Sequence, residues 1–524
     1  MTRDMDIDGT TAADRSGPLL VGVDFGTTNI KAIVFDTAGR VVAQASTPTP
    51  TRIPRPGRAY YLPEEMWQRT VEALRRVTGQ LDDPARVASI AFASLGETAV
   101  PIDADDQPTY HAIAWFDQRT RPQAEWLGRV IGRDRLFSVT GLSLSELFGL
   151  CKVLWFKQEE PDAYIRTVKW LNVADYLAYR LSHVAATDYS LASRMLSLDL
   201  RELRWADDIL GEVGVPPELF APLTSSGTDL GPILPEVARA TGLPEATRVA
   251  VGGHDHVCGA LAAGVVSPGM ALNSNGTSEV MFLPLQKPLS DPQLGRQGFE
   301  VGVHVDGEHY YTWGTVRTSG ACVDWFRNQF ASDMDYAELI EAARPVQPGS
   351  MGVCFLPHLR SAVTPHFDEK SLGAFAGLSA DVDRQTMFRA VLEGIAFEIH
   401  DALQTLLPYT GMPISTINAI GGGTRNELLM EIKASVLNTV IEVVDMEEAV
   451  ALGAAMLGGL AAGVYGDVHD AMRNVQHSRT VFRPDASQTA VYERLFREVY
   501  QQMYSALRPL SHAIYDFREE SLQR

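Results

Sequence analysis

Residues 249–264 read VAVGGHDHVCGALAAG, which combines an apolar strand, a Gly-Gly break and the start of an apolar helix. The helix is predicted to begin at or near Asp255, with His254 and His256 on either side of that carboxylate. Open α/β sheets bind ligands at the carboxyl ends of their strands, so Asp255 is a candidate for chemistry. An Asp can also cap a helix by accepting from its free N–H groups, and in isolation capping is the better interpretation.

A second informative stretch is the turn DFGTTN at residues 24–29, which lies between two apolar strands. Gly26 lets the backbone come close to a bound group, and the hydroxyls of Thr27 and Thr28 add donors that can face an anion. Asp24 would place a negative charge beside that anion, which makes sense only with a cation between them. An ordinary hairpin turn is the alternative interpretation.

This turn is echoed by SNGTS at residues 274–278, again between two predicted strands. A short echo is weak evidence for a repeat. Because the two turns open the two halves of the chain, they nevertheless suggest two similar domains, each presenting a Gly-Thr turn to one cleft.

A third pattern begins with a predicted strand at residues 414–420, followed by three glycines and a helix from Glu427. Flat backbone at such a point can approach a base or a phosphate. A linker is the alternative, but it would not sit between an apolar strand and an apolar helix. The Ala- and Gly-rich helix at residues 447–462 is expected to pack behind a strand at residues 440–444, and a last helix is predicted at residues 488–511.

Glu97 lies in a loop that follows a predicted strand at residues 87–93, where a carboxylate can accept hydrogen bonds from hydroxyl groups. Trp115, Asp117 and Arg119 form a compact group shortly afterwards. A surface ion pair with a packed Trp explains that group as well as a binding site does.

Length and charge exclude several classes of protein. The chain has 524 residues, which suggests about two to four domains. Its net charge of -20 leaves no basic footprint, so neither nucleic acid nor an anionic membrane surface is an expected partner. Residues 1–17 are polar without an apolar signal core, and a disordered tail is expected there. With four widely spaced cysteines, these features predict a cytoplasmic protein.

Two common nucleotide-binding motifs are absent from the sequence. It contains no Gly-Lys dipeptide, so a P-loop is excluded, and no G-x-G-x-x-G fingerprint follows the first strand.

Taken together, these stretches resemble the FGGY family of carbohydrate kinases, within the actin-like ATPase superfamily, from about Leu19 to about Val464. The motifs that carry the resemblance are DFGTTNIKA (24–32), GGHDHVCGAL (252–261), SNGTSEV (274–280), TSGACVDWF (318–326), FRAVLEGIAFE (388–398), IGGGTRNELLMEIKASVLN (420–438) and ALGAAMLGG (451–459). The resemblance implies an α/β protein with two actin-like (ribonuclease H-like) ATPase domains around a central cleft. We expect a sugar-binding domain that holds the catalytic base at residues 18–264, a nucleotide-binding domain at 265–466 and a helical extension at 467–524.

The resemblance also implies roles for single residues, with ATP and Mg²⁺ as cofactors. Asp255 would be the general base on the sugar hydroxyl, and Asp24 would help to hold Mg²⁺. The residues implied for substrate binding are Glu97, Trp115, Asp255 and His256. Those implied for the triphosphate are Thr27, Thr28, Gly276, Thr277 and Gly320. Those implied for adenosine are Gly422, Gly423 and Asn426.

The acceptor loop departs from well-known members of the family. Xylulose kinases usually carry Gln-Met-His-Gly where this chain has LGET at residues 95–98. Glycerol kinases carry Arg-Glu-Thr, and here Gly96 stands in the place of the Arg, while Leu147 matches their substrate-contacting Tyr. His256 follows the base where Asn or Gln is common.

We therefore expect ATP-dependent phosphorylation of a small ketose or polyol, with a xylulose-like sugar favoured. A glycerol or tetritol kinase, or a non-kinase ATPase or sugar sensor of the same superfamily, is the alternative. A hydrolase that binds metal through His254, Asp255 and His256 is a further rival, although adjacent residues rarely converge on one ion. A sugar or polyol is the expected partner, with no nucleic acid, no membrane and a homodimer as one option for assembly.

Overall fold

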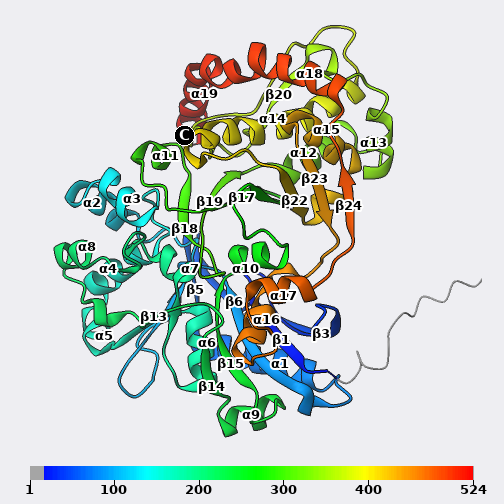
Figure 1. The fold of residues 1–524 in the computed structure, drawn as a ribbon. Coiled ribbons are helices and arrows are strands. Elements are labelled where there is room, and N and C mark those ends of the chain that lie inside the picture. Colours follow the sequence, from blue (N-terminus) through cyan, green and yellow to red (C-terminus); the bar gives the residue numbers. More distant parts are fainter. Residues whose placement is uncertain (1–16, 523–524) are drawn as a thin grey trace, which may run out of the picture.

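The structure is a computed structural model that describes residues 17–522, so the tail predicted for residues 1–17 lies outside the described residues except for Gly17. The described chain forms two lobes, each built around one large sheet, with the first lobe in the lower part of Figure 1 and the second in the upper part. Helices cover both sheets, and the predicted α/β class is confirmed.

The two large sheets contain six and seven strands. In spatial order, the first consists of β14 (Asp229–Pro232), β15 (Arg248–His254), β6 (Val87–Ser94), β1 (Leu19–Phe25), β2 (Asn29–Phe35) and β3 (Val41–Pro48). The second consists of β18 (Glu300–Val303), β19 (Tyr310–Val316), β17 (Glu279–Leu285), β16 (Met270–Asn275), β22 (Thr416–Ile420), β23 (Val440–Val444) and β24 (Arg479–Phe482).

Five strands of each sheet share one topology. The order β3-β2-β1-β6-β15 in the first lobe corresponds to β19-β17-β16-β22-β23 in the second. In both, three antiparallel strands are followed by two parallel ones. The two domains suggested by the echoed turns are thus present, with one Gly-Thr hairpin in each.

The first sheet is covered on both faces, which explains why its central strand is almost wholly apolar. In β1 every residue but Asp24 is buried. The helices in contact with this sheet or with one another are α1 (Pro63–Thr78), α6 (Val173–Ser182), α9 (Pro235–Thr241), α10 (Asp255–Ala262) and α16 (Ala449–Ala461).

The position of α16 differs from our expectation. We expected this helix to pack behind β23, and that expectation is wrong, because it packs on β1, β6 and β15 of the first lobe and on α10. Missing side chains allow the close approach. A Cβ on Gly22 would lie 1.8 Å from the Ala451 carbonyl oxygen, and one on Gly453 would lie 1.9 Å from that of Cys258. The helix has no polar face that would have indicated its partner.

A helical part flanks the first lobe on the left of Figure 1. It contains α2 (Arg121–Val130), α3 (Arg133–Thr140), α4 (Gly149–Glu159), α5 (Pro161–Arg166) and α8 (Asp207–Val213). The helices of the second lobe are α11 (Pro292–Arg296), α12 (Gly320–Phe330), α13 (Tyr336–Ala343), α14 (Arg384–Thr410) and α15 (Glu427–Leu437).

Short elements complete the fold. The strands are β4 (Thr51–Arg55), β5 (Arg58–Tyr61), β7 (Ala99–Ile102), β8 (Ala112–Ile113), β9 (Lys169–Asn172), β10 (Thr187–Asp188), β11 (Leu198–Asp199), β12 (Arg204–Trp205), β13 (Leu223–Thr224), β20 (Cys354–Leu356) and β21 (Ala374–Ala376). The helix α7 (Tyr189–Ala192) runs into a 3-10 turn at Ser193–Met195.

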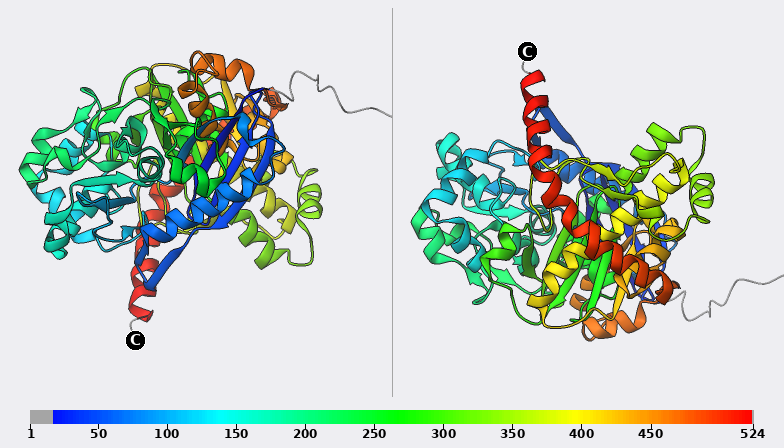
Figure 2. Two further views of the ribbon diagram at one scale, coloured as in Figure 1. Left: turned by 90° about the horizontal axis from the view of Figure 1, so that it is seen from below. Right: turned by 90° about the horizontal axis from the view of Figure 1, so that it is seen from above.

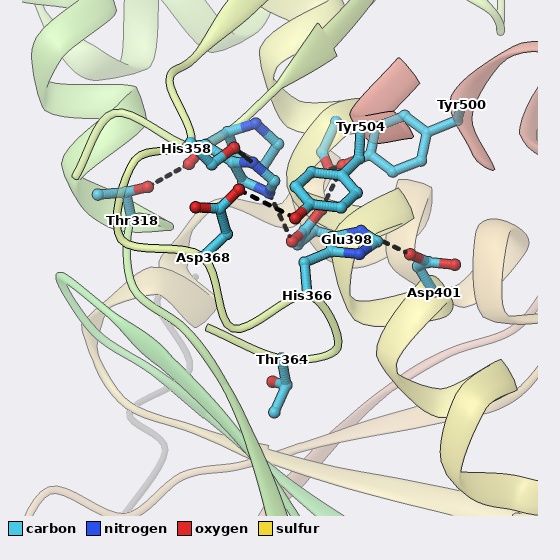
Figure 3. A network of polar contacts seen from close by, with 12 residues as sticks. Thr318, His358, Thr364, His366, Asp368, Glu398, Asp401, Tyr500 and Tyr504 are labelled. Carbon is cyan, nitrogen blue, oxygen red and sulfur yellow. Dashed lines mark hydrogen bonds and ion pairs between the residues drawn. The ribbon is translucent and has the colours of Figure 1, made fainter. Parts of the chain in front are cut away.

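The C-terminal helices are α17 (Val468–Asn474), α18 (Ala486–Leu495) and α19 (Gln501–Leu522), the last two joined by a π-helical turn, so this part is longer than the predicted helix. A network of polar contacts joins the π-helical turn and the start of α19 to α14 and to the loop at residues 357–371 (Figure 3). Its contacts are His358 to Glu398 (2.8 Å), Tyr500 to Glu398 (2.7 Å), Tyr504 to Asp368 (3.0 Å) and His366 to Asp401 (3.2 Å). The first part of α19 is therefore fixed to the second lobe, while its end projects from the molecule (Figure 2).

No helix within residues 17–522 is both long enough and apolar enough to cross a bilayer.

Candidate active site

Asp255 is the first residue of α10, directly after β15. The cap position of the helix belongs to His254, so capping does not explain the acid that follows it. The Asp255 carboxylate accepts from the His256 N–H at 2.6 Å and lies 3.1 Å from the His254 imidazole, with 23% of the side chain exposed. A partly exposed carboxylate at a strand end is a geometry suited to reaction with a ligand in the cleft.

His254 is held in place as a neutral neighbour of this acid. Its backbone N–H donates to the Ser190 hydroxyl at 2.8 Å, and its side chain is buried. Burial lowers the pKa of His254 to about 3, although the charge of Asp255 opposes that change. His256 stacks on it, with 5.8 Å between the ring centroids, and both rings contact Trp313 of β19. Residues from both lobes therefore surround Asp255.

Asp24 at the end of β1 interacts electrostatically with Asp255. Burial first, and then the charge of Asp255, raises the pKa of Asp24 to about 7, while Lys31 opposes the shift. The charge of Asp255 therefore makes the Asp24 carboxylate more costly to ionise. A cation at this position would offset that cost, as the turn sequence suggested.

The first hairpin presents exposed polar groups beside Asp24. Thr27 and Thr28 are exposed at its tip, and the Gly26 N–H is bonded within the turn to the Asn29 carbonyl at 3.0 Å. The Trp115 indole donates to the Thr27 hydroxyl at 3.1 Å, which brings a predicted substrate residue against a predicted phosphate residue.

The second hairpin opens into a pocket of about 560 Å³. The predicted nucleotide residues that line it are Gly276, Thr277, Gly320, Gly422, Gly423 and Asn426. Thr27 and Thr28, by contrast, belong to the hairpin of the other lobe and are not in this lining. The pocket thus contains predicted residues that lie up to 150 positions apart in the sequence, such as Gly276 and Asn426.

One wall of this pocket is backbone and another is apolar. The Gly320 N–H donates to the Gly276 carbonyl at 3.1 Å, and a Cβ on Gly320 would lie 2.6 Å from that oxygen. The apolar and aromatic lining is Val323, Tyr336, Ile340 and Leu429. Such a pocket accepts a flat apolar group at one side and an anion or polar group at the other.

Asn426 has two functions in this pocket. Its side-chain oxygen accepts from the Leu429 N–H at 3.1 Å and so caps α15. Its amide nitrogen is buried and has no hydrogen-bond partner among the residues that the structure describes. A buried donor without a partner is costly, and a ligand in the pocket is one way to satisfy it.

A buried charge network below the second hairpin was not predicted. Lys433 of α15 is fully buried and donates to Glu279, to Asn275 and to the Asn273 side chain, the last at 3.1 Å. The other Glu279 oxygen accepts from the Ser319 hydroxyl at 2.6 Å. The positive charge of Lys433 therefore neutralises Glu279 at the base of this hairpin. The sequence held one signal, the single basic residue of a helix that reads ELLMEIKASVL.

A second buried charge cluster lies on the acceptor side of Asp255. Arg194 donates to Glu97 at 2.6 Å and to Glu300 of β18 at 2.6 Å, and Trp313 donates to the same Glu300 oxygen at 3.0 Å. The guanidinium also lies 4.8 Å from the Trp313 ring centroid. Glu97, which we predicted as a direct substrate ligand, is thus paired with an arginine that the sequence did not single out.

Gly96 explains how Arg194 reaches Glu97. A Cβ at this position would lie 2.9 Å from the Arg194 side chain and 2.9 Å from the His254 ring. The glycine that departs from the Arg-Glu-Thr pattern therefore leaves room for an arginine from another segment. Burial raises the pKa of the Glu97 carboxyl, and Arg194 and Lys152 oppose that rise.

The group formed by Trp115, Asp117 and Arg119 divides in the structure. Asp117 and Arg119 form a bidentate ion pair with side chains 0% and 4% exposed, so the pair is internal rather than on the surface. Only Trp115 contacts the hairpin of the cleft.

The structure does not support the metal-hydrolase rival. Within residues 17–522, no three His, Cys, Asp or Glu side chains are grouped so that they could hold a metal ion.

Two family models match almost the whole of this two-lobed chain. The N-terminal domain of the FGGY family of carbohydrate kinases matches residues 19–262, and the C-terminal domain of the same family matches residues 271–462. The chain belongs to the FGGY family of carbohydrate kinases. It is therefore a sugar or polyol phosphotransferase.

Individual relatives of this FGGY kinase differ in their names. A xylulose kinase of Bacillus subtilis is 31% identical over 505 residues, which cover 95% of this chain and 99% of the relative. A gluconokinase of the same organism is 27% identical, covering 85% of this chain and 88% of the relative. The crystal structure of a xylulose kinase from Rhodospirillum rubrum has a TM-score of 0.86 and 25% identity, covering 94% of this chain and 100% of that chain. The acceptor is left open by these names.

Proposed function

We propose that this FGGY kinase transfers the γ-phosphoryl group of ATP to a hydroxyl of a small neutral ketose or polyol, with a xylulose-like sugar favoured. The observation that carries the proposal is the placement of Asp255, a partly exposed acid at a strand end whose charge acts on Asp24 of the first hairpin. Phosphoryl transfer relies mainly on positioning and charge neutralisation, and this cleft supplies groups for both.

The nucleotide occupies the pocket of the second hairpin in this proposal. Its apolar wall suits adenine, and the buried amide nitrogen of Asn426 offers a donor to the adenosine. The phosphates extend over Gly276 and Gly320 towards the hydroxyls of Thr27 and Thr28 on the opposite lobe. Two domains that close on one nucleotide exclude water from the transferred phosphoryl group.

The residues at the first hairpin fit a divalent cation. Asp24 is an oxygen donor of the kind that Mg²⁺ prefers. Burial and the charge of Asp255 raise the pKa of its carboxyl, and a cation beside the carboxylate would favour its charged form. Asp24 would hold the ion, which when bound neutralises phosphate charge.

Asp255 acts as the general base. It accepts the proton of the acceptor hydroxyl as that oxygen forms a bond to the γ-phosphorus and the bond to ADP breaks. Its neighbour His254 carries no charge at neutral pH, so it does not compete with the acceptor for the carboxylate by forming an ion pair. Trp313 and His256 shield the acid from water.

The charge balance of the acceptor side favours a neutral acceptor over a sugar acid. Arg194 is already neutralised by two carboxylates, Glu97 and Glu300. The nearby Lys152 is fully buried and donates to the Leu147 carbonyl. An acidic sugar would need a cation without such partners, since burying an unpaired carboxylate is costly.

The first experiment compares wild-type protein with the Asp255→Asn variant in a coupled assay across three- to six-carbon polyols, ketoses and gluconate. We expect a neutral ketose or polyol to be phosphorylated, with turnover lower by about 10²–10⁴-fold in the variant. ATP affinity, measured by calorimetry, should be unchanged. Near-wild-type turnover in Asp255→Asn would remove the assignment of the base, and preference for gluconate would overturn the neutral acceptor.

Glu97 is tested separately, because its role is to order the acceptor side. We expect Glu97→Ala to raise the acceptor KM more than the ATP KM, since the substitution leaves the pocket of the second hairpin intact and removes one of the two carboxylate partners of Arg194. The control is Asp117→Asn, which disturbs the buried ion pair with Arg119 and not the cluster of Glu97, Arg194 and Glu300. It should not raise the acceptor KM relative to the ATP KM. Equal changes in both constants for Glu97→Ala would mean that Glu97 is only structural.

A further inference from the structure

One hydrogen bond joins the tip of the first hairpin to a distant segment of the same lobe. The Trp115 indole N–H donates to the Thr27 hydroxyl at 3.1 Å, although the two residues lie 88 positions apart in the chain. The family resemblance assigns Thr27 to the triphosphate and Trp115 to the acceptor. The bond therefore links a predicted phosphate-binding residue to a predicted acceptor-binding residue.

The direction of this hydrogen bond follows from the chemistry of its two partners. An indole N–H can only donate, whereas a hydroxyl has one proton to donate and two lone pairs that accept. Thr27 is therefore the acceptor, and its own O–H proton is directed elsewhere. Within residues 17–522 the structure gives that proton no acceptor, and Thr27 is exposed at the tip of the hairpin. The hydroxyl is thus prepared to donate to an anion in the cleft.

Trp115 is held in a turn that directly follows β8. The Ala114 N–H donates to the Ala59 carbonyl at 3.0 Å, and the Asp117 N–H donates to the Ala114 carbonyl at 3.1 Å. The indole packs against the hydrophobic core of the first lobe and meets the Phe116 ring edge-on, with 5.4 Å between the ring centroids. A donor held in this way restricts the orientation of the hydroxyl that accepts from it, so less freedom is lost during reaction.

The backbone of the first hairpin is braced by other contacts. The Thr49 hydroxyl donates to the Gly26 carbonyl at 2.7 Å, and the Thr49 N–H donates to the Thr28 carbonyl at 3.0 Å. The Leu95 N–H donates to the Phe25 carbonyl at 3.2 Å. Loss of the indole bond should therefore leave the hairpin backbone in place and free only the hydroxyl at its tip.

We propose, on the basis of the function proposed above, that Trp115 is a positioning residue for phosphoryl transfer. Its indole N–H orients the Thr27 hydroxyl so that the hydroxyl proton points at the transferred phosphoryl group. Charge spreads over the equatorial oxygens of that group in the transition state, and a donor oriented beforehand stabilises it. Accepting a bond from the indole also polarises the hydroxyl and strengthens it as a donor.

The test is a double-mutant cycle in the coupled assay, with the best acceptor of the three- to six-carbon panel. Trp115→Phe keeps an aromatic ring and removes the N–H, so kcat should fall by about 2–10-fold while both KM values stay unchanged. Thr27→Val removes a bond to a charged group, and kcat should fall by about 10–100-fold. Because Trp115 acts through Thr27, adding Trp115→Phe to Thr27→Val should change kcat by less than about twofold.

The matched control is Trp205→Phe, because the Trp205 indole donates elsewhere, to the Ala221 carbonyl at 3.4 Å. Its kcat should equal that of wild type. An unchanged kcat in Trp115→Phe would overturn the proposal. So would a raised acceptor KM in that variant, since the N–H would then bind the acceptor. Multiplication of the two single effects in the double variant would mean that the two residues act independently, which would also overturn it.

Failure of the proposed function gives a different result from failure of this inference. The same cycle can be measured on ATP hydrolysis by water, which needs no acceptor but uses the same oriented donor. A wild type that hydrolyses ATP and phosphorylates no member of the panel would overturn the proposed function, while the cycle on hydrolysis still decides the role of Trp115. A wild type without either activity would overturn both.

Discussion

The two Gly-Thr hairpins share a backbone pattern but balance their charges differently. At the first hairpin, burial and then the charge of Asp255 raise the pKa of Asp24 to about 7. At the second, Glu279 is paired with the fully buried Lys433 and needs nothing from outside. The same fold motif therefore carries two interacting acids at the first hairpin and a neutralised ion pair at the second.

The difference separates two tasks within one cleft. A hairpin with neutralised charge suits the nucleotide-holding surface that we propose for the second lobe. An acidic hairpin beside the proposed base suits a site where an ion and a transferred group come and go. The predictions below test this contrast.

The largest expected effect concerns the neutral hairpin. Lys433→Met leaves the Glu279 carboxylate buried without its cation, which should lower the free energy of unfolding by about 3–5 kcal/mol. Urea unfolding of the purified variant measures this loss. The double variant Lys433→Met/Glu279→Gln removes both charges and should recover most of it, and a single variant within about 1 kcal/mol of wild type would contradict the contrast.

A smaller effect is expected at the acidic hairpin, and it depends on pH. The pKa of Asp24 is about 7 in the folded protein and 3.8 as its ordinary value, so between these limits the folded state holds the extra proton. Without added metal, the free energy of unfolding should therefore fall as pH rises from about 4 to 7, by at most about 1.4 kcal/mol per pH unit from this group. Asp24→Asn lacks this contribution and serves as the reference.

Urea unfolding at half-unit pH intervals, in the presence of a chelator, gives the two stability profiles. They should converge near pH 4 and separate towards pH 7, with Asp24→Asn the more stable protein at neutral pH. Parallel profiles would mean that the pKa of Asp24 is not raised in the folded protein, and the contrast between the two hairpins would fail.

The smallest effect is expected for the ion pair between β2 and the residue that precedes α16, beside the first hairpin. Lys31 of β2 contacts Glu448 at 2.9 Å, with side chains 36% and 20% exposed. Lys31→Met should change the free energy of unfolding by less than about 1 kcal/mol, because water and salt screen such pairs. Since Lys31 opposes the rise in the pKa of Asp24, Lys31→Met should raise that pKa further and shift the pH-dependent loss of stability to higher pH. A shift to lower pH would refute the coupling between Lys31 and Asp24.

Sequence reasoning located the parts of the site that short segments determine. Asp255 follows its own strand, and each Gly-Thr turn joins two adjacent strands, so the local pattern was sufficient to predict where these groups lie. The glycines that line the pocket of the second hairpin likewise belong to short turns and helix starts.

The cluster of Glu97, Arg194 and Glu300 could not be predicted, because its members come from distant and irregular segments. Arg194 lies in a 3-10 turn, 97 positions after Glu97, and Glu300 lies on an edge strand, 106 positions after Arg194. Only the fold brings them together. Gly96 was noticed as a departure from a family pattern, but its reason, the space that Arg194 occupies, was visible only in the structure.

The packing of α16 has a consequence for how the protein is made. This helix covers the sheet of the first lobe, yet it is encoded at residues 449–461, close to the end of the chain. During synthesis the strands of the first lobe are therefore complete before α16 has been made. The part of the sheet that α16 covers stays exposed until almost two hundred further residues have been added. A fragment that stops at residue 264 would share this defect, so expression of the first lobe alone should yield aggregates rather than a stable domain.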